Sequence, residues 1–319
     1  MIGICLLLIA AGGFLYWQVT GGDVSNPRAN FWRVVRDGLP AYSSTPQQGH
    51  TVLIGNSNEN WREVRNGFIM PLAQWIILIV LLAIGLLYKI AGPDRLEKSR
   101  SGIKVERYAK ADRILHWYTA VLFITMAVTG FSLILGRLFL IPVIGLQANS
   151  VWLELSKVLH NYCGPLLLIG IMFEVILWMK FNIPQKVDLE WVKKMTGRLK
   201  DAKPHIGRVN AGQKAWFWLV AACGAIVGIT GILLDFPIWG QSHFTMQLSH
   251  VIHAVVAILF VGAALGHIYM GSIGVEGVFE GMWNGTVDAV WAEQHADLWY
   301  AEKMKKTADR EVSAAEGPA

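Results

Sequence analysis

Long apolar stretches with few charged residues constrain this chain more than any other feature. Six of them are long enough to cross a hydrocarbon core of about 30 Å, which takes roughly 18 or more apolar residues in a helix. They run approximately over residues 2–19, 71–90, 114–135, 151–181, 215–234 and 246–273. Because a continuous helix satisfies its own backbone hydrogen bonds inside lipid, the chain is predicted to be an all-α membrane protein.

The first of these stretches has two interpretations. A short apolar block at an N-terminus is also typical of a signal peptide. Residues 1–19, however, have no basic segment before the block and no clear small-residue cleavage site. We therefore expect an N-terminal transmembrane helix or signal anchor that is not cleaved.

The Lys and Arg residues indicate which side of the membrane each loop faces. The connecting segments Lys89–Arg113 and Lys180–Lys214 are strongly basic. In contrast, Asp235–Ser249 has no Lys or Arg, and Gly136–Ser150 has one. The positive-inside rule places the basic segments and the C-terminus on the cytoplasmic side of a bacterial inner membrane. The net charge of +5 does not predict nucleic-acid binding, because these residues form no patch interleaved with aromatics.

The three cysteines argue against two kinds of redox site in this chain. Cys5, Cys163 and Cys223 all lie in apolar stretches and form no C-x-x-C or C-x-x-C-H pair. Iron–sulfur clusters and covalently attached haem need such thiols. The sequence also has no glycine-rich phosphate loop, so nucleotide chemistry is not expected.

Four of the nine histidines lie well inside predicted membrane helices, where ionisable side chains are costly and usually have a role. They are His116, His160, His253 and His267. His253 and His267 lie close to four turns apart on one helix, which places them on one face about 21 Å apart. In the predicted orientation, His116 lies near the inner surface at the depth of His267. His160 lies nearer the outer surface, at the depth of His253.

Two histidine pairs at two depths favour bis-histidine ligation of two b-type haems. A single membrane histidine often only hydrogen-bonds to a neighbouring helix, but four at matching depths are harder to explain in that way. Copper or zinc usually takes a third or fourth His, Cys or carboxylate, and the sequence places none at the same depth. We therefore predict a four-helix transmembrane dihaem cytochrome b bundle with one or two additional N-terminal transmembrane helices.

Some glycines and arginines near these histidines have ordinary explanations. Small residues are common where membrane helices pack, so Gly224, Gly228 and Gly231 are interpreted as packing contacts. Arg113 and Arg137 are candidates for pairing with haem propionates. Long basic side chains near helix ends usually extend to lipid headgroups, however, and we favour that interpretation for both.

Five motifs stand out along the second half of the chain: DRILHW (112–117), VLHNYCG (158–164), KFNIP (180–184), VNAGQK (209–214) and VIHAVVAILFVGAALGHIYM (251–270). Together they resemble the membrane cytochrome b (gamma) subunit of the respiratory formate dehydrogenases, over about Arg107 to Tyr300. The haem ligands of that family fall on the same four histidines. The N-terminal extension before about Glu106 departs from the shorter members.

The resemblance also implies a quinone site beside the inner haem. It would hold menaquinone or ubiquinone at Asn210 and Gly212, with Gln213 and His267 adjacent. From the residues alone, an ordinary helix N-cap is the preferred interpretation of Asn210.

The resemblance implies a role within a three-subunit complex. A molybdenum or tungsten pterin alpha subunit would oxidise formate, and an iron–sulfur beta subunit would pass the electrons to this chain. They would cross from the outer to the inner haem and reduce quinone on the cytoplasmic side, which contributes to proton motive force. Several copies of the heterotrimer could assemble. Alternatives are the cytochrome b subunit of a hydrogenase or thiosulfate reductase, a cytochrome b561-like reductase acting alone, and a haem-free anchor or transporter.

These inferences predict a simple domain organisation. The chain is expected to consist of an N-terminal helix (1–19), a periplasmic loop (20–70), an additional transmembrane helix (71–91), a basic cytoplasmic linker (92–112), the four-helix dihaem core (113–273) and a cytoplasmic tail (274–319). No formate-oxidising site is expected in any of them.

Overall fold

The computed structural model describes residues 63–195 and 205–315, all of which belong to one compact unit, Asn56–Ala319. The predicted helix over residues 1–19 and nearly all of the predicted loop over residues 20–70 lie outside the described residues. Five helical segments in the described part are long and apolar enough to cross a membrane. The five spans predicted between residues 71 and 273 are therefore confirmed.

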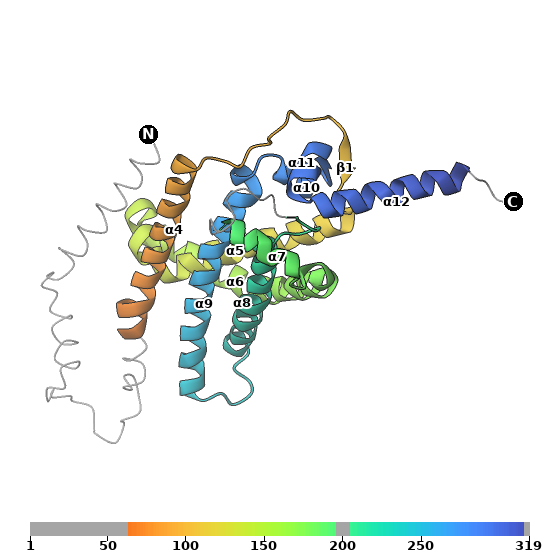
Figure 1. Ribbon diagram of the computed structural model, residues 1–319. Coiled ribbons are helices and arrows are strands. Elements are labelled where there is room, and N and C mark those ends of the chain that lie inside the picture. The colour runs from red at the N-terminus through yellow and green to blue at the C-terminus, as the bar shows by residue number, and fades with distance from the viewer. Residues whose placement is uncertain (1–62, 196–204, 316–319) are drawn as a thin grey trace, which may run out of the picture. The chain divides into compact units, whose positions relative to one another are not determined.

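Figure 1 shows these spanning segments. They are α4 (Met70–Ile90), which continues from the π-helical turn η2 (Arg65–Ile69), α5 (Lys110–Phe139), α6 (Ile141–Asn182), α8 (Ala211–Asp235) and α9 (His243–Tyr269), which continues into the π-helical turn η3 (Met270–Gly274). A shorter amphipathic helix, α7 (Lys186–Met195), follows α6.

The start of α6 differs most from its predicted span. The helix begins at Ile141 and not near Val151, because a short helical segment precedes the long one. Gly145 separates the two parts with a φ of 78° and a ψ of 169°, a backbone conformation that residues with a side chain rarely adopt. A glycine at this position therefore permits the kink.

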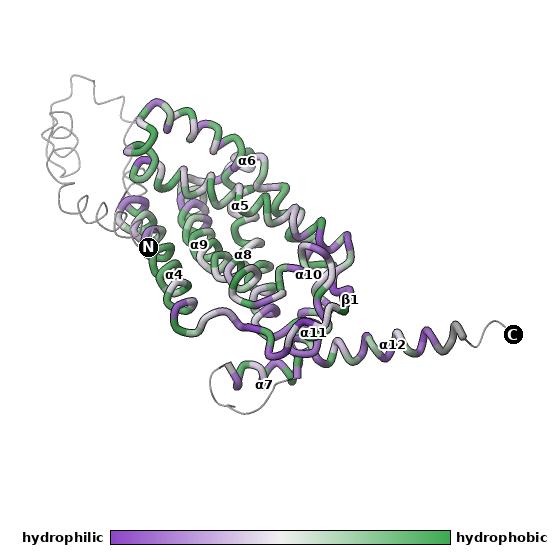
Figure 2. Tube along the Cα trace, turned by 90° about the horizontal axis from the view of Figure 1, so that it is seen from above, coloured by the Kyte–Doolittle hydropathy of each residue, from purple (hydrophilic) through white to green (hydrophobic). Residues whose placement is uncertain are grey.

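Neighbouring helices pack in a simple order. α5 packs against α6, α6 against α8, α8 against α9, and α4 against α9. A buried apolar cluster joins η2, α4, α5 and α9 and consists of Ile69, Ala73, Leu135 and Ile258. Many large apolar side chains on the outer faces are exposed, and Figure 2 shows the spanning helices as predominantly hydrophobic. An apolar exterior of this kind suits a lipid environment.

The chain before α5 and the chain after α9 fold together into a region that we call the polar cap, residues 91–109 and 275–300. Its regular elements are β1 (Lys104–Glu106), α10 (Val278–Asn284), β2 (Thr286–Asp288), α11 (Ala289–His295) and the start of α12 (Asp297–Ala315). β1 and β2 pair antiparallel, with Val105 opposite Val287. Val287, Trp291 and Ala292 form the buried core of the cap. The predicted linker and the first part of the predicted tail thus form one folded region.

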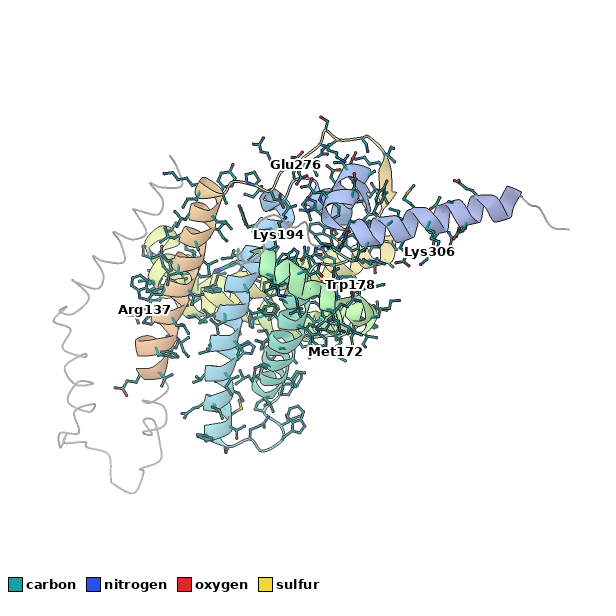
Figure 3. The ribbon with its side chains drawn as sticks, viewed as in Figure 1. Arg137, Met172, Trp178, Lys194, Glu276 and Lys306 are labelled. Atoms are coloured by element: carbon teal, nitrogen blue, oxygen red, sulfur yellow. The ribbon has the colours of Figure 1, made fainter. Side chains whose placement is uncertain are left out.

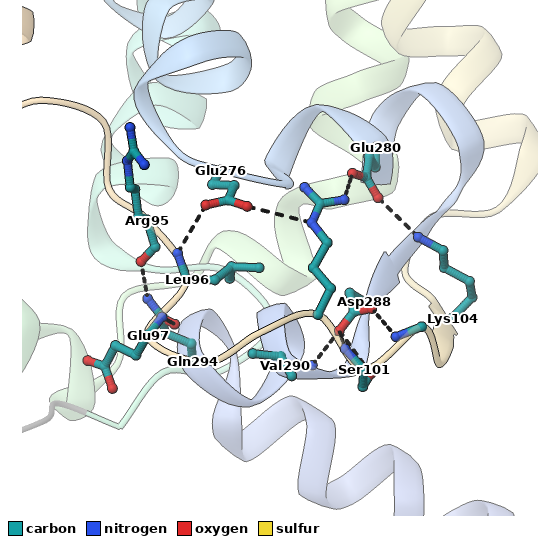
Figure 4. A network of polar contacts seen from close by, with 12 residues as sticks. Arg95, Leu96, Glu97, Ser101, Lys104, Glu276, Glu280, Asp288, Val290 and Gln294 are labelled. Carbon is teal, nitrogen blue, oxygen red and sulfur yellow. Dashed lines mark hydrogen bonds and ion pairs between the residues drawn. The ribbon is translucent and has the colours of Figure 1, made fainter.

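Opposite charges also join the two halves of the polar cap (Figure 4). Arg100 contacts both Glu276 and Glu280, and Lys104 Nζ lies 3.2 Å from Glu280 Oε2. Partly exposed pairs of this kind contribute only about 0–1 kcal/mol each. The acidic residues of the tail therefore partly neutralise the basic linker, while the buried apolar core supplies more of the stability.

Asp288 is the most constrained polar residue of the cap, with 3% of its surface exposed. Its Oδ1 accepts hydrogen bonds from Val290 N–H, Ser101 N–H and the Ser101 hydroxyl, at 3.0, 3.1 and 2.9 Å. Its Oδ2 accepts one from Gly102 N–H at 2.9 Å. Burial by itself would raise the pKa of Asp288, but these hydrogen bonds to the ionised carboxylate lower its pKa from 3.8 to about 2.

We expect acid to remove the contribution that the ionised Asp288 carboxylate makes to the stability of the polar cap. The folded cap holds the carboxylate at a lowered pKa, so the contribution is complete above about pH 4 and disappears as the pH falls towards 2. Hydrogen exchange of the Ser101, Gly102 and Val290 amides, corrected for intrinsic rates, measures the loss. In the control variant Asp288→Asn, protection should be lower at neutral pH and show no further loss in acid. Full protection of the wild type at pH 2 would contradict this.

Candidate functional site

Two pairs of histidines face each other across the bundle. His160 of α6 faces His253 of α9, with ring centroids 6.2 Å apart. His116 of α5 faces His267 of α9, with ring centroids 6.4 Å apart. All four residues are half-buried. The structure therefore brings the four predicted residues together as an outer pair, His160 and His253, and an inner pair, His116 and His267.

The spacing within each pair fits a metal ion held between two imidazoles. Two metal–imidazole bonds of about 2.0 Å, with roughly 1.2 Å from each nitrogen to its ring centre, put the centroids about 6.4 Å apart. By comparison, the directly stacked rings of Trp216 and His267 have centroids 4.5 Å apart. The histidine pairs therefore suit bis-histidine ligation of haem iron, which needs facing imidazoles and few other donors.

Thr129 and Thr230 fix the rings of the outer pair. Thr129 Oγ1 lies 2.8 Å from His160 Nδ1, and Thr230 Oγ1 lies 3.1 Å from His253 Nδ1. Each hydroxyl donates its own proton to a backbone carbonyl one turn earlier, at 2.8 and 2.7 Å. Where the hydroxyl proton goes to that carbonyl, the threonine oxygen accepts from the imidazole, an arrangement that puts the hydrogen on Nδ1 and leaves Nε2 free. Metal-ligating histidines are commonly oriented by such a partner.

A glycine follows each of these threonines and makes room for the same ring. A Cβ atom on Gly130 would come within 3.1 Å of His160 Cε1, and one on Gly231 within 3.3 Å of His253 Cε1. The interpretation of Gly231 as a helix-packing residue alone therefore needs correction. Gly130 and Gly231 lie directly against the candidate ligands, and a larger side chain at either position would displace the ring.

Aromatic rings pack against both rings of the inner pair. Trp216 of α8 stacks on His267, with ring planes 8° apart. Trp117 makes an edge contact with His116, with centroids 5.2 Å apart. His116 Nδ1 is buried and has no hydrogen-bond partner among residues 63–195 and 205–315. The two pairs thus differ in chemistry, because the outer rings have polar partners and the inner rings have aromatic ones.

A largely apolar pocket lies between the inner histidines, and one ionisable side chain besides them lines it. That side chain is Glu174 of α6, which hydrogen-bonds to the Thr119 hydroxyl of α5. A carboxyl group inside a membrane span is costly and usually has a function. The sequence contained the signal, since Glu174 is the only charged residue between Pro165 and Met179. Its position beside the histidines became clear only from the structure.

The VNAGQK motif forms the start of α8. Asn210 Oδ1 accepts from Gln213 N–H at 2.9 Å, and Gln213 Oε1 accepts from Asn210 N–H at 3.0 Å. This reciprocal capping box agrees with the helix-cap interpretation of Asn210. It uses the two side-chain oxygens, so the side-chain NH2 donors remain for another acceptor. Trp216, which stacks on His267, lies one turn beyond Gln213 on the same helix.

Helix α7 is anchored beside this motif. Lys214 Nζ lies 2.8 Å from Asp188 Oδ2, and their side chains are only 6% and 15% exposed. A Cβ atom on Gly212 would come within 3.0 Å of the Trp191 ring, so a glycine allows Trp191 to lie against the start of α8. The buried ion pair and this close contact therefore hold the VNAGQK segment in place.

The other sequence predictions have mixed outcomes. Gly224 and Gly228 pack against side chains of α6, as expected. Arg137 is exposed near the end of α5, on the opposite side of the view from Trp178 in Figure 3. Arg113 was expected to extend to lipid headgroups. Instead, its Nη2 donates to the Trp283 carbonyl of the polar cap at 2.6 Å.

Sequence reasoning missed the residues that support the histidines. The available signal was a Thr-Gly pair after a β-branched apolar residue, which occurs at Val128–Gly130 (Val-Thr-Gly) and at Ile229–Gly231 (Ile-Thr-Gly). Thr-Gly is too short a motif to predict a site by itself. Its meaning depends on α5 lying against α6 and α8 against α9, which places each threonine beside a histidine of the next helix.

Comparison with known proteins gives a consistent set of matches. Residues 107–285 match the family described as prokaryotic cytochrome b561. The cytochrome b556(Fdn) subunit of the nitrate-inducible formate dehydrogenase of Escherichia coli (strain K12) is 31% identical over 207 residues, covering 63% of this chain and 92% of the relative. The formate dehydrogenase cytochrome b556 subunit of Haemophilus influenzae is 26% identical over 217 residues, covering 63% and 84%. The b556(fdo) subunit of Escherichia coli (strain K12) is 26% identical over 211 residues, covering 64% and 95%.

Proposed function

Because this chain belongs to the prokaryotic cytochrome b561 family and resembles its formate dehydrogenase cytochrome b556 members, we propose that it carries electrons from an iron–sulfur partner subunit to quinone. The observation that carries this proposal is the pair of histidine–histidine spacings, 6.2 and 6.4 Å. Two redox centres stacked across a membrane provide an electron path that a single centre does not.

Four residues would hold two b haems, His160 and His253 the outer one, and His116 and His267 the inner one. When bound, the haems supply one-electron redox centres through which electrons pass from the outer to the inner side. The hydroxyls of Thr129 and Thr230 hold the outer imidazoles in the tautomer that presents Nε2.

The quinone site is proposed at the start of α8, at Asn210 and Gly212, with Gln213 and His267 adjacent. The free NH2 groups of Asn210 and Gln213 are suitable donors for a quinone carbonyl. Trp216 contacts His267 and lies one turn from Gln213, so it links the motif to the inner pair. Either menaquinone or ubiquinone fits these donors.

Electron flow in this direction would contribute to proton motive force. Electrons enter at the outer surface, and the protons that quinone takes up come from the cytoplasm. Moving one elementary charge across the membrane costs about 2.3 kcal/mol per 100 mV, so the donor must be strongly reducing. Formate, oxidised in a molybdenum or tungsten pterin alpha subunit, is such a donor.

The basic segments support the proposed orientation in a bacterial inner membrane. The polar cap contains Lys98, Arg100 and Lys104, and it lies at the end of the bundle where α5 begins and α9 ends. The positive-inside rule places that end, together with the C-terminus, in the cytoplasm. The iron–sulfur beta subunit would then dock at the opposite end, near the outer histidine pair, and several heterotrimers could associate.

The test of this function is donor-specific haem reduction in the purified complex. Formate should produce a reduced b-type α-band, and added quinone should reoxidise it. Hydrogen in place of formate tests the alternative of a hydrogenase cytochrome b subunit, and thiosulfate as an oxidant tests the thiosulfate reductase alternative. Haem that dithionite reduces but formate does not would reject the formate dehydrogenase role. Folded protein without haem would favour an anchor or transporter.

We expect Asn210→Ser to separate the quinone role of Asn210 from its capping role. Serine is also a good N-cap, so α8 should keep its start, while the NH2 donor is lost. The rate of haem reoxidation at low quinone concentration should fall roughly fivefold to tenfold, as expected for the loss of about one hydrogen bond. Formate-driven reduction should not change. Equal reoxidation rates in the variant and the wild type would leave Asn210 as a cap alone.

A further inference from the structure

A second pocket lies where α5 begins and α6 ends, and it has a volume of about 460 Å³. Four basic side chains line it, together with aromatic rings: Arg107, Lys180, Arg208 and Lys303, with Trp178, Phe181 and Trp299. None of its lining residues also lines the pocket between the inner histidines. The two pockets are therefore separate sites.

Arg107 is the most buried of the four basic side chains that line this pocket and is only 5% exposed. Its Nη2 donates to the Arg208 carbonyl at 2.9 Å, and its guanidinium lies over the rings of Trp291 and Trp299, at 4.5 and 5.3 Å. Its Nη1 is buried without a hydrogen-bond partner, and no carboxylate pairs with it, within the described part of the chain. A buried cation without an anion is unfavourable, so Arg107 adds positive charge to the pocket lining that no carboxylate of the described residues neutralises.

The two acidic residues that line the pocket do not supply that charge. Asp112 Oδ1 accepts from Trp178 Nε1 at 2.9 Å, and Asp112 Oδ2 accepts from Ala109 N–H at 3.2 Å, so both oxygens are engaged. Glu106 has a side chain that is 73% exposed, and its Oε2 lies 3.9 Å from Lys303 Nζ. Neither carboxylate reaches Arg107.

Two further cations that line the pocket, Arg208 and Lys180, both lie over the ring of Phe181. The Arg208 guanidinium lies 4.2 Å and the Lys180 ammonium 4.9 Å from the centre of the Phe181 ring. Among the described residues, neither cation has a carboxylate partner. Three basic groups without such a partner thus surround one cavity, an arrangement that fits a phosphate group with several oxygen acceptors.

We propose that this pocket binds the phosphate of an anionic phospholipid. The pocket lies at the ends of spanning helices, where headgroups are expected and where Trp178 suits the interface. Leu177 also lines the pocket and is 51% exposed, so an apolar surface for acyl chains adjoins the cationic lining. Basic pockets between helices are established binding sites for acidic headgroups. This inference depends on the membrane location and not on the electron-transfer role.

Native mass spectrometry of the delipidated complex, after addition of phosphatidylglycerol or phosphatidylcholine, tests the proposal. The wild type should retain phosphatidylglycerol at least tenfold more tightly than phosphatidylcholine. Lys180→Gln should weaken phosphatidylglycerol binding about fivefold, and Arg107→Gln about tenfold. The matched control is Lys110→Gln, because Lys110 begins α5 at the same end of the bundle but does not line the pocket. Its binding should equal that of the wild type.

Several outcomes would overturn the proposal. Equal retention of the two lipids, or unchanged binding in Lys180→Gln, would show that the pocket does not select an acidic headgroup. Displacement of the lipid by millimolar inorganic phosphate would identify a site for free phosphate. A shifted haem midpoint potential in Arg107→Gln with unchanged lipid binding would assign the cation to a haem propionate. Because Lys180 is exposed, its variant decides the question even if Arg107→Gln fails to fold.

Discussion

Replacement of any one of the four paired histidines by alanine is expected to halve the haem content, from two haems b per chain to one. In the proposed arrangement each imidazole would supply one of the two protein ligands of an iron, and an alanine leaves a cavity with no donor in its place. His160→Ala and His253→Ala should lose the same spectral component, while His116→Ala and His267→Ala should lose the other. Pyridine haemochrome quantification and a dithionite-reduced minus oxidised spectrum measure both effects.

The control for this experiment is His250→Ala. His250 lies on α9 about one turn before His253, and it should leave both haems in place. Far-ultraviolet circular dichroism of each variant shows whether its helices are intact. Each of the four histidines can also be replaced by glycine. Recovery of the lost haem spectrum when imidazole is added to such a variant would support a direct ligand role. A folded His267→Ala variant that keeps two haems would refute the proposed inner pair.

Removal of either threonine hydroxyl beside the outer pair should weaken binding of the outer haem by roughly 10–100-fold. Valine has the shape of threonine but has no hydroxyl, so Thr129→Val and Thr230→Val lose the contact with Nδ1 together with the hydrogen bond that each hydroxyl donates to a backbone carbonyl of its own helix. The imidazole becomes a weaker donor, and the midpoint potential of the outer haem should become more positive because the ferric state is less stabilised. Haem titration and spectroscopic redox titration provide the two measurements.

Two control variants make the threonine prediction specific. Thr129→Ser keeps the hydroxyl and should retain near-normal haem binding. Thr125→Val alters a hydroxyl one turn earlier on α5 that donates only to the Val121 carbonyl, and it should have no effect on the potential. If Thr129→Val matched Thr125→Val in both affinity and potential, the hydrogen bond to His160 would have no role in holding the haem.

The sequence alone predicted the spanning helices and the depths of the histidines. Both depend on local properties, namely the length of an apolar run and the fixed rise of an α-helix. The separation between His253 and His267 follows from the chain itself, whatever the neighbouring helices do. The same argument predicted which histidines share a depth. The structure places the ring centroids of those pairs 6.4 and 6.2 Å apart, a separation that fits one metal ion between two imidazoles.

Contacts between distant segments were decided only by the tertiary structure. Thr129 meets His160, and Thr230 meets His253, because neighbouring helices pack in a particular rotation about their axes. The polar cap brings Ser101 to Asp288 across nearly 190 residues of chain. No local pattern predicts such pairs, because they depend on how complete helices pack. The sequence thus predicted the five spans that the described residues form and the relative depth of each candidate ligand, and the packing decided which side chains lie against each candidate ligand.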